Sequence, residues 1–255
     1  MKGKKEMEFS VVILAGGKGT RMGKVKKPLL HIENKPIIDW VLEGLGEIEP
    51  SQIILVSGQD NSPALIDYLG DRLQNMRFAY QPIDNGTAGA ANAALPLVNR
   101  DLTLVLFGDD SALYTPETLG RFLYHHIDNH YFMSVMALKR DVVTDVGGLE
   151  IVDDEVVGVL TKGGHERAGI TSSHTMCGCM AFYTPWLKKN IKKLKPSPLS
   201  GELTLPSLIY EAKRSKTRVG MYLLEDEREW SSVNTPDELN IAKRKMNSLI
   251  KDGKK

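Results

Sequence analysis

A strand that ends in a glycine-rich loop constrains this chain more than any other feature. The sequence VVILAGGKGTRM begins at residue 11, and its first four residues are apolar, which predicts a buried strand. Glycines follow at Gly16, Gly17 and Gly19. Without a Cβ, these residues reach backbone conformations of positive φ and let peptide N–H groups approach a ligand closely. The loop is therefore a candidate for phosphate binding, with an ordinary turn from strand to helix as the alternative.

Basic residues in and after the loop favour phosphate binding over the ordinary turn. They are Lys18, Arg21, Lys24, Lys26 and Lys27. The whole chain has 33 Lys and Arg against 32 Asp and Glu, so the attraction for phosphate is local and no global field draws the protein to nucleic acid or a membrane. The glycine spacing fits neither a P-loop nor a dinucleotide-binding fingerprint. We expect a loop that binds a triphosphate in another way.

Alternating strands and helices predict an α/β fold. The apolar runs and helical patterns of the first half cover residues 9–14, 36–46, 52–57, 87 onward and 102–107. Continuous apolar strands separated by helices favour a mainly parallel sheet covered on both faces, which is a three-layer, Rossmann-like arrangement. Ligands of such sheets bind beyond the carboxyl ends of the strands. One shared site is therefore expected at that edge.

The length of 255 residues predicts one domain with two halves. Residues 9–130 form the expected nucleotide-binding half, residues 131–235 the acceptor-binding half, and residues 236–255 a closing helix and tail. The strands expected in the second half are shorter and cover residues 131–139, 149–152, 156–161 and 175–183. The N-terminal MKGKKEME lacks a signal-peptide core, and no apolar run is long enough to span a membrane, so we expect a cytoplasmic protein.

A carboxylate follows a second buried strand directly. The run LTLVLF ends at Phe107 and is followed by Gly108, Asp109 and Asp110. Mg²⁺ usually takes one or two protein carboxylates together with phosphate oxygens. We predict that Asp109 is a metal ligand. The alternative is a turn aspartate that caps the next helix, which fits Asp110 and Ser111 well.

Two further motifs carry side-chain amides. QPIDNGTAGA places Gln81 before Gly86 and Thr87, and a glutamine amide can donate and accept at once, so it can bind the edge of a base. Thr87 also suits the N-cap of the alanine-rich helix. In SSVNTPDEL, Asn234 precedes Thr235 and Pro236, which are a typical N-cap and first residue of a helix.

These motifs, in this order, resemble those of the sugar-phosphate nucleotidyltransferases. The family signature L-A-x-G-x-G-T-R-M/L matches the glycine loop and is followed by a Lys-Pro-Leu-Leu run that starts at Lys27. The family's Q-x(4)-G-T-A, G-D and V-N-T-P motifs match the runs at Gln81, Asp109 and Asn234. The resemblance covers most of the chain. It is nearest to the uridylyltransferases that act on N-acetylglucosamine 1-phosphate.

The resemblance implies roles for particular residues. Arg21, Lys27 and Asp109 would be catalytic, with Arg21 on the departing pyrophosphate and Lys27 on the α-phosphate. Asp109 and Asn234 would hold Mg²⁺. The nucleotide-binding residues implied are Leu14, Ala15, Gly16, Gly17, Gly19, Thr20, Gln81, Gly86 and Thr87.

On the acceptor side the resemblance implies Gly148, Lys162 and Gly178 as substrate-binding residues. Here the sequence departs from the family. Thr161 stands where the family has Glu, and Met176 and Cys177 replace the Asn and Thr of the strand that grips an N-acetyl group. The motifs therefore indicate the type of reaction more clearly than the identity of the sugar.

The expected function is transfer of a nucleotide from a nucleoside triphosphate, UTP or dTTP favoured, to a sugar 1-phosphate, with release of pyrophosphate. One alternative is a guanylyl- or cytidylyltransferase acting on mannose 1-phosphate or a non-sugar phosphate. Another is a catalytically silent regulatory subunit that binds a nucleotide sugar. The acceptor, regulation, pathway and oligomeric state stay open.

Cysteine and histidine clusters suggest a metal site only weakly. His174, Cys177 and Cys179 spell H-x-x-C-x-C, but a closed zinc site takes four ligands, so reduced thiols packed on a strand are the better interpretation. His125, His126 and His130 follow an amphipathic helical stretch. We interpret these three as a solvated helix end.

Overall fold

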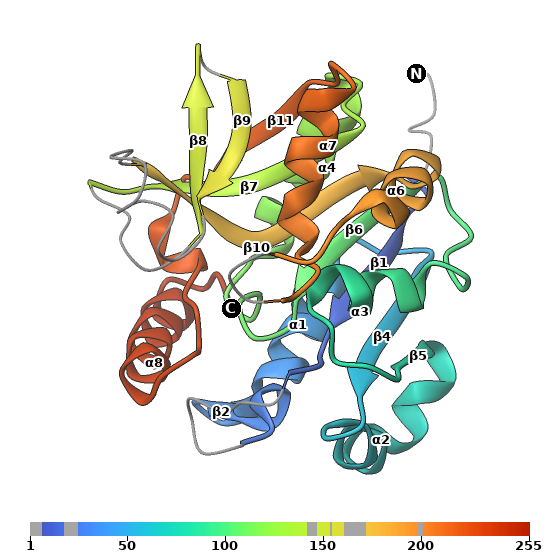
Figure 1. Ribbon diagram of the computed structural model, residues 1–255. Coiled ribbons are helices and arrows are strands. Elements are labelled where there is room, and N and C mark those ends of the chain that lie inside the picture. The colour runs from blue at the N-terminus through green and yellow to red at the C-terminus, as the bar shows by residue number, and fades with distance from the viewer. Residues whose placement is uncertain (1–6, 18–24, 142–146, 154, 161–171, 198–200) are drawn as a thin grey trace, which may run out of the picture.

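The computed structural model describes residues 7–17, 25–141, 147–153, 155–160, 172–197 and 201–255. Seven strands form its central sheet in the order β11-β7-β10-β6-β1-β4-β5 (Figure 1). Their bounds are β1 Ser10–Leu14, β4 Gln52–Gly58, β5 Arg77–Gln81, β6 Leu102–Phe107, β7 Met133–Lys139, β10 His174–Tyr183 and β11 Val219–Leu223. Two more strands, β8 Gly148–Val152 and β9 Glu155–Leu160, form a hairpin that joins the sheet through β10.

Most of this sheet is parallel, as the continuous apolar runs predict. β1 pairs in parallel with both β4 and β6, and Ser10 lies opposite Gln52 on one side and Thr103 on the other. β10 runs antiparallel to its two neighbours, β6 and β7, while β11 is parallel to β7. One reversed strand therefore joins the two halves into a single mixed sheet. A separate small ladder pairs β2 His31–Ile32 with β3 Lys35–Pro36.

Helices cover both faces of the sheet and give the molecule three layers (Figure 1). One face packs against α1 Ile37–Gly46, α2 Ser62–Leu69, α4 Pro116–Asp128 and α8 Pro236–Lys251. The other packs against α3 Thr87–Ala94, α6 Thr184–Asn190 and α7 Leu208–Arg214. Alternate residues of each strand face opposite layers, so Val11 and Ile13 belong to the first core and Val12 and Leu14 to the second. Because both faces are covered, β1 is buried along its whole length.

The closing helix confirms the sequence prediction in detail. α8 begins at Pro236 after Thr235, whose side chain caps the helix in a capping box with Glu238. Ala242, Met246 and Leu249 are buried on one face, as their spacing indicates. Among the described residues, no helix combines the length and apolar character needed to cross a membrane.

The histidines at the end of α4 correct one prediction. His126 is buried, and its Nδ1 lies 2.8 Å from the Ser134 Oγ on β7. His126 lies on the inward face of the helix, on the same side as the buried Leu119 and Phe122. The helical spacing that predicts burial of those two residues predicts burial of His126 as well. His130, by contrast, is exposed. The solvated helix end thus begins after His126.

The two cysteines lie on β10, where both are buried and free, as predicted. β10 also carries a bulge between Met176 and Met180. At its centre Gly178 adopts a φ of 54°, and a Cβ added there would lie 2.8 Å from that of Asp110. A glycine suits this position because its backbone is left-handed and the neighbouring side chain is close.

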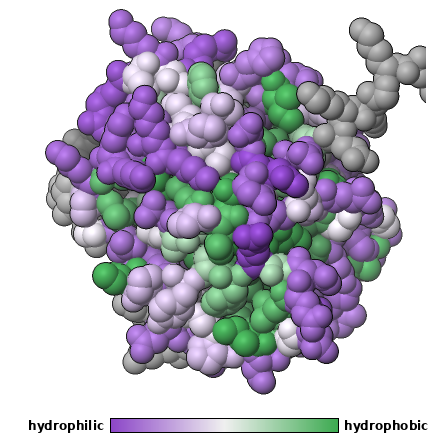
Figure 2. Space-filling model, turned by 90° about the vertical axis from the view of Figure 1, so that its right-hand side faces the viewer, coloured by the Kyte–Doolittle hydropathy of each residue, from purple (hydrophilic) through white to green (hydrophobic). Residues whose placement is uncertain are grey.

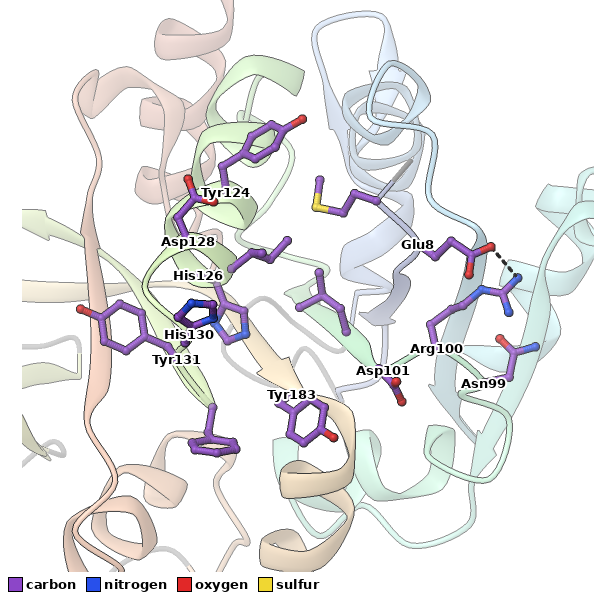
Figure 3. A pocket seen from close by; sticks show the side chains of 14 residues that line it. Glu8, Asn99, Arg100, Asp101, Tyr124, His126, Asp128, His130, Tyr131 and Tyr183 are labelled. Atoms are coloured by element: carbon purple, nitrogen blue, oxygen red, sulfur yellow. Dashed lines mark ion pairs between the residues drawn. The ribbon is translucent and has the colours of Figure 1, made fainter. Parts of the chain in front are cut away.

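One hollow of the described surface lies away from the expected site. Figure 2 shows hydrophobic side chains gathered in the middle of the face on the right of Figure 1, among hydrophilic ones. A hollow of about 790 Å³ is lined by aromatic side chains, among them Tyr124, Tyr131 and Tyr183 (Figure 3). Leu102, which starts β6, also lines it, whereas the expected site lies beyond the other end of this strand. The lining of this hollow contains none of the residues that the sequence predicts to be functional.

Candidate active site

The carboxyl ends of three parallel strands bring separate motifs together. β1 lies between β4 and β6, and hydrogen bonds continue the pairing beyond the strands. Ala15 N–H donates to the Val56 carbonyl at 2.8 Å, and Gly108 N–H donates to the Leu14 carbonyl at 2.9 Å. The glycine loop and Asp109 therefore leave the sheet side by side, at the edge where ligands of such sheets bind.

Glycines shape the described part of the loop. Gly17 has a φ of 115°, a backbone conformation that other residues rarely adopt. A Cβ at Gly16 would lie 3.4 Å from the Gln81 Oε1, so the absent side chain keeps the loop next to the end of β5. Gly19, Thr20 and Arg21 lie outside the described residues.

Lys27, Asp109 and Asn234 converge on one point, although they are far apart in the sequence. The Lys27 Nζ donates to the Asp109 Oδ2 and to the Asn234 Oδ1, each at 2.7 Å. The side chains of Lys27 and Asp109 are 14% and 30% exposed, so this ion pair lies at the edge of the solvent. The sequence motifs predict that all three lie near the phosphates, and the structure brings them together.

The backbone around each member explains the convergence. Lys27 starts a short 3-10 turn with Pro28 in its first positions, and this turn packs beside α1. Asn234 precedes the cap of α8, and the Glu238 carboxylate accepts hydrogen bonds from the backbone N–H groups of Asn234 and Thr235. The capping box thus fixes the residue that carries the amide oxygen.

Gln81 ends β5 and is 5% exposed. Its Nε2 donates to the Asn85 Oδ1 at 3.1 Å and to the Gly86 carbonyl at 3.3 Å. These bonds hold the amide at the wall of the cleft next to Gly16. A buried amide in a polar cleft has a strong requirement for hydrogen-bond partners, which makes it suited to selecting among ligands.

These side chains line one cleft of about 360 Å³. Its lining is Leu14, Gly16, Gly17, Lys27, Gln81, Asp84, Gly86, Thr87, Ala90, Phe107, Asp109, Glu202 and Asn234. Most of the nucleotide-side residues named from the sequence are present. Ala15 is buried beside the cleft and does not line it.

The two described acceptor-side residues, Gly148 and Gly178, do not line this cleft. Gly148 begins β8, paired with Thr175 and Leu160, and does not line the cleft. Gly178 packs against Asp110 and Phe107, one layer behind the lining. Lys162 lies outside the described residues, as does Thr161.

Resemblance to known proteins agrees with this geometry. Residues 11–146, more than half of the chain, match the model of a family described as the MobA-like NTP transferase domain. The chain belongs to this family. The match begins in β1 and includes the glycine loop, Lys27, Gln81 and Asp109, so the family model covers most of the cleft.

Curated relatives extend the similarity beyond the family model. A bifunctional protein GlmU from Alcanivorax borkumensis is 28% identical over 242 residues, which are 93% of this chain and 51% of that protein. A GlmU from an Exiguobacterium species is 30% identical over 256 residues, which are 97% of this chain and 56% of that protein. The chain spans about half the length of these curated relatives.

Solved structures share the fold. A Bacillus anthracis chain assigned as a glucose-1-phosphate thymidylyltransferase, crystallised with sucrose, has a TM-score of 0.74 at 20% identity, covering 93% of this chain and 95% of its own. A UDP-glucose pyrophosphorylase in complex with UDP-glucose has a TM-score of 0.73 at 17% identity, covering 96% and 100%. The predicted three-layer, Rossmann-like α/β fold is confirmed.

The structure also assigns Thr87 differently from the sequence prediction. The N-cap of α3 is Gly86, with a φ of 98°, and Thr87 is the first helical residue. The Thr87 Oγ1 accepts a hydrogen bond from the Leu205 N–H at 2.8 Å. A Cβ at Gly86 would lie 2.6 Å from the Leu203 carbonyl oxygen, so the segment around Leu203 packs directly on this turn. The Thr87 hydroxyl therefore bonds to this segment instead of capping α3.

Asp110 is a residue whose setting the sequence did not reveal. It caps no helix, because the N-cap of α4 is Thr115. Burial raises the pKa of its carboxyl well above the ordinary value, and the neighbouring charge of Asp109 raises it further. Asp109 faces the cleft while Asp110 packs against Gly178. Successive residues that leave a strand tend to point to opposite sides, and this alternation was the available signal.

The oxygen donors fit a magnesium ion. Mg²⁺ takes one or two protein oxygen ligands together with phosphate oxygens, and the Asp109 Oδ2 and Asn234 Oδ1 both face the same cation, the Lys27 ammonium. This ammonium shows that the pair of oxygens can accommodate a positive charge. Within the described ranges, no cluster of three or more His, Cys, Asp or Glu could hold a metal, which includes the H-x-x-C-x-C run.

Proposed function

We propose that this protein is a sugar-phosphate nucleotidyltransferase that joins a nucleoside triphosphate, UTP or dTTP favoured, to a sugar 1-phosphate. The observation that carries the proposal is the convergence of Lys27, Asp109 and Asn234 in the cleft that the glycine loop and Gln81 also line. A cation, a carboxylate and an amide oxygen suit a polyphosphate and its metal. The family membership and the motif order support the same reaction.

The reaction needs charge neutralisation and positioning rather than a protein nucleophile. A phosphate oxygen of the acceptor forms a bond to the α-phosphorus, the bond from this phosphorus to the bridging oxygen of the β-phosphate breaks, and pyrophosphate leaves with that electron pair. Lys27 would contact the α-phosphate. Arg21 and the loop N–H groups would hold the pyrophosphate, and Lys162 the acceptor phosphate, both as the family resemblance implies.

Asp109 and Asn234 would hold Mg²⁺, which when bound neutralises charge on the phosphate oxygens. The Lys27 ammonium would then leave the oxygens of Asp109 and Asn234 and contact a phosphate oxygen of the triphosphate. This exchange keeps the number of opposite charges around the ammonium similar before and after the triphosphate binds. The same two residues thus serve as partners of Lys27 in the free protein and as metal ligands in the complex.

A pyrimidine base is favoured by Gln81. One amide can pair with both a carbonyl and an imide N–H of uracil or thymine. The names of the two structural neighbours, a thymidylyltransferase and a UDP-glucose pyrophosphorylase, are consistent with such bases and with a sugar phosphate as acceptor. Gly148 and Gly178 would bind the acceptor, as the family resemblance implies.

One sheet runs through both halves, which supports our proposal that residues 1–255 act as one domain. Cys177 and Cys179 are buried free thiols, which fits a reducing compartment, and we propose a cytoplasmic location on that basis.

Pyrophosphate release across a panel of triphosphates and sugar phosphates tests the function. UTP, dTTP, CTP and GTP are offered together at equal concentration with each acceptor and Mg²⁺, and the nucleotide sugars formed are separated by mass. The proposal predicts uridylyl or thymidylyl products. Gln81→Ala should reduce the preference for UTP and dTTP over CTP and GTP, because the buried contact to the base is lost. Preferential formation of products from GTP or CTP by the wild type would overturn the choice of base. Binding of a nucleotide sugar without any turnover would overturn the enzymatic function in favour of a regulatory subunit.

A further inference from the structure

Asn61 contacts the glycine loop, although it belongs to none of the motifs described above. Its side-chain Nδ2 donates to the Ala15 carbonyl at 3.2 Å and to the Gly17 carbonyl at 3.0 Å. The residue is 3% exposed. One buried amide therefore bridges the segment after β4 to both sides of Gly16.

The position of Asn61 in its own helix makes this contact unusual. Asn61 is the N-cap of α2, where an asparagine side chain normally accepts a hydrogen bond from the first turn. Here the side chain makes no cap hydrogen bond. The backbone of Asn61 is nevertheless well held, because its N–H donates to the Gly58 carbonyl and its carbonyl accepts from Leu65. The side chain is thus committed to the loop instead of the helix.

The chemistry of the contact fixes the orientation of the amide. Both partners are carbonyl oxygens, which only accept, so the nitrogen of the amide must face them. Peptide units are planar and trans, so the N–H of Gly16 points opposite to the Ala15 carbonyl and therefore away from Asn61. Gly16 lines the cleft. Gly17, with its φ of 115°, has wide conformational freedom, so a contact that limits this freedom has a large effect on the loop.

We propose that Asn61 is a positioning residue that holds residues 15–17, at the start of the glycine loop, in the conformation that binds the triphosphate. The inference rests on the proposed function, since it assigns the loop to the nucleotide. Asn61 does not line the cleft that holds Lys27 and Asp109. It lines a smaller adjoining cavity of about 260 Å³ together with Gly17, Gln81 and Asp84, which also line the cleft. Its effect is to remove conformational freedom from the loop before the ligand arrives, which strengthens binding without a new contact.

The test compares Asn61→Asp with the wild type. The aspartate is nearly isosteric but has no donors when ionised, and it would place negative charge against two carbonyl oxygens. Asn92→Asp, at an exposed position of α3, is the matched control for the same change of charge. Asn61→Ala removes the contact without adding charge and serves if Asn61→Asp does not fold, as judged by thermal unfolding. UTP, or the triphosphate that the wild type uses best, is the probe.

We expect Asn61→Asp to raise both the Kd for that triphosphate, measured by calorimetry with Mg²⁺, and its KM by about tenfold, the effect of roughly one lost hydrogen bond. The KM for the sugar 1-phosphate should change less than about twofold. A general loss of stability would not raise one KM and leave the other unchanged, so this difference identifies a positioning role. A folded Asn61→Asp or Asn61→Ala variant that binds the triphosphate like the wild type overturns the role of Asn61 alone. A wild type that binds no triphosphate overturns the proposed function, and the inference with it.

Discussion

The two halves of the sheet present their candidate residues in different ways. In the first half, Gln81 and Asp109 stand at or just beyond the ends of parallel strands, and the cleft gathers them with Lys27. In the second half, Gly148 and Gly178 lie within strands and do not line the cleft. Parallel strand ends meet at one edge, so short motifs there predict a site. Within an antiparallel strand, placement depends on bulges and register, which short motifs do not encode.

The largest effect should come from the carboxylate in the first half. We expect Asp109→Asn to lower kcat by at least about a hundredfold at saturating Mg²⁺, since it removes a charge that stabilises the phosphates and their metal. Steady-state pyrophosphate release measures the loss, and thermal unfolding shows that the fold is intact. Asp128→Asn, at the exposed end of α4, is the control and should retain full activity. Near-normal turnover of Asp109→Asn would remove this residue from the site.

Lys27 tests the same half at a second point. Lys27→Ala should lower kcat/KM for the triphosphate about thirtyfold, because a charge-assisted contact is lost. This factor corresponds to about 2 kcal/mol of transition-state stabilisation. Arg21→Ala should have an effect of similar size if it holds the pyrophosphate. Lys189→Ala, at an exposed position of α6, is the control. Equal kcat/KM values for wild type, Lys27→Ala and Arg21→Ala would contradict a role of these two cations in binding the triphosphate.

Gly178 tests whether the second half depends on its bulge. Gly178→Ala should destabilise the protein by about 2 kcal/mol, because the residue has a φ of 54° and the new Cβ would lie 2.8 Å from the Asp110 Cβ. Gly201→Ala is the matched control, since Gly201 has a φ of 71° but no atom within 4 Å of an added Cβ. It should show the backbone effect alone, about 1 kcal/mol. Equal urea midpoints for the two variants would contradict the crowding at the bulge.

His126 links the two halves, and its effect is the smallest. Burial, and to a lesser degree the nearby His125, lower its pKa from 6.5 to about 4. Below pH 6.5 the unfolded chain takes up a proton that the folded protein refuses until about pH 4, so stability falls as the pH drops through this window. The loss between pH 7.5 and 5.5 should be about 1.3 kcal/mol.

Urea unfolding at a series of pH values checks this contribution. His126→Asn should flatten the decline in stability between pH 6.5 and 4, whereas His130→Asn, at an exposed position with a φ of 53° that asparagine tolerates, should leave the decline unchanged. Burial also lowers the pKa of His125, so part of the slope should remain in both variants. An unaltered slope in His126→Asn would contradict the link.

Local patterns predicted the fold because they are repeated along the chain. Apolar runs marked β1, β4 and β6, and the Thr235–Pro236 pair marked the start of α8. These signals are short in range. Combined with the general rule for parallel sheets, they predicted that the residues named for the nucleotide side lie at one edge, and most of these residues line one cleft.

Contacts between distant segments were beyond such patterns. The bond of Asn61 to the glycine loop, the bulge at Gly178 and the hydrogen bond of Thr87 to Leu205 each join segments that no periodicity relates. His126 was different, since its helical spacing indicated burial but its polar ring argued for the surface. Its partner, the Ser134 hydroxyl, becomes evident only when β7 packs beside α4.

The most direct measurement is a crystal structure of the protein with UTP and Mn²⁺, in which anomalous scattering locates the metal without reference to the protein. The account predicts a peak between the Asp109 carboxylate and the Asn234 amide oxygen, at the place of the Lys27 ammonium, with Lys27 moved to the α-phosphate. A metal bound away from both oxygens, or a triphosphate bound outside the cleft while Lys27 keeps both contacts, would contradict it.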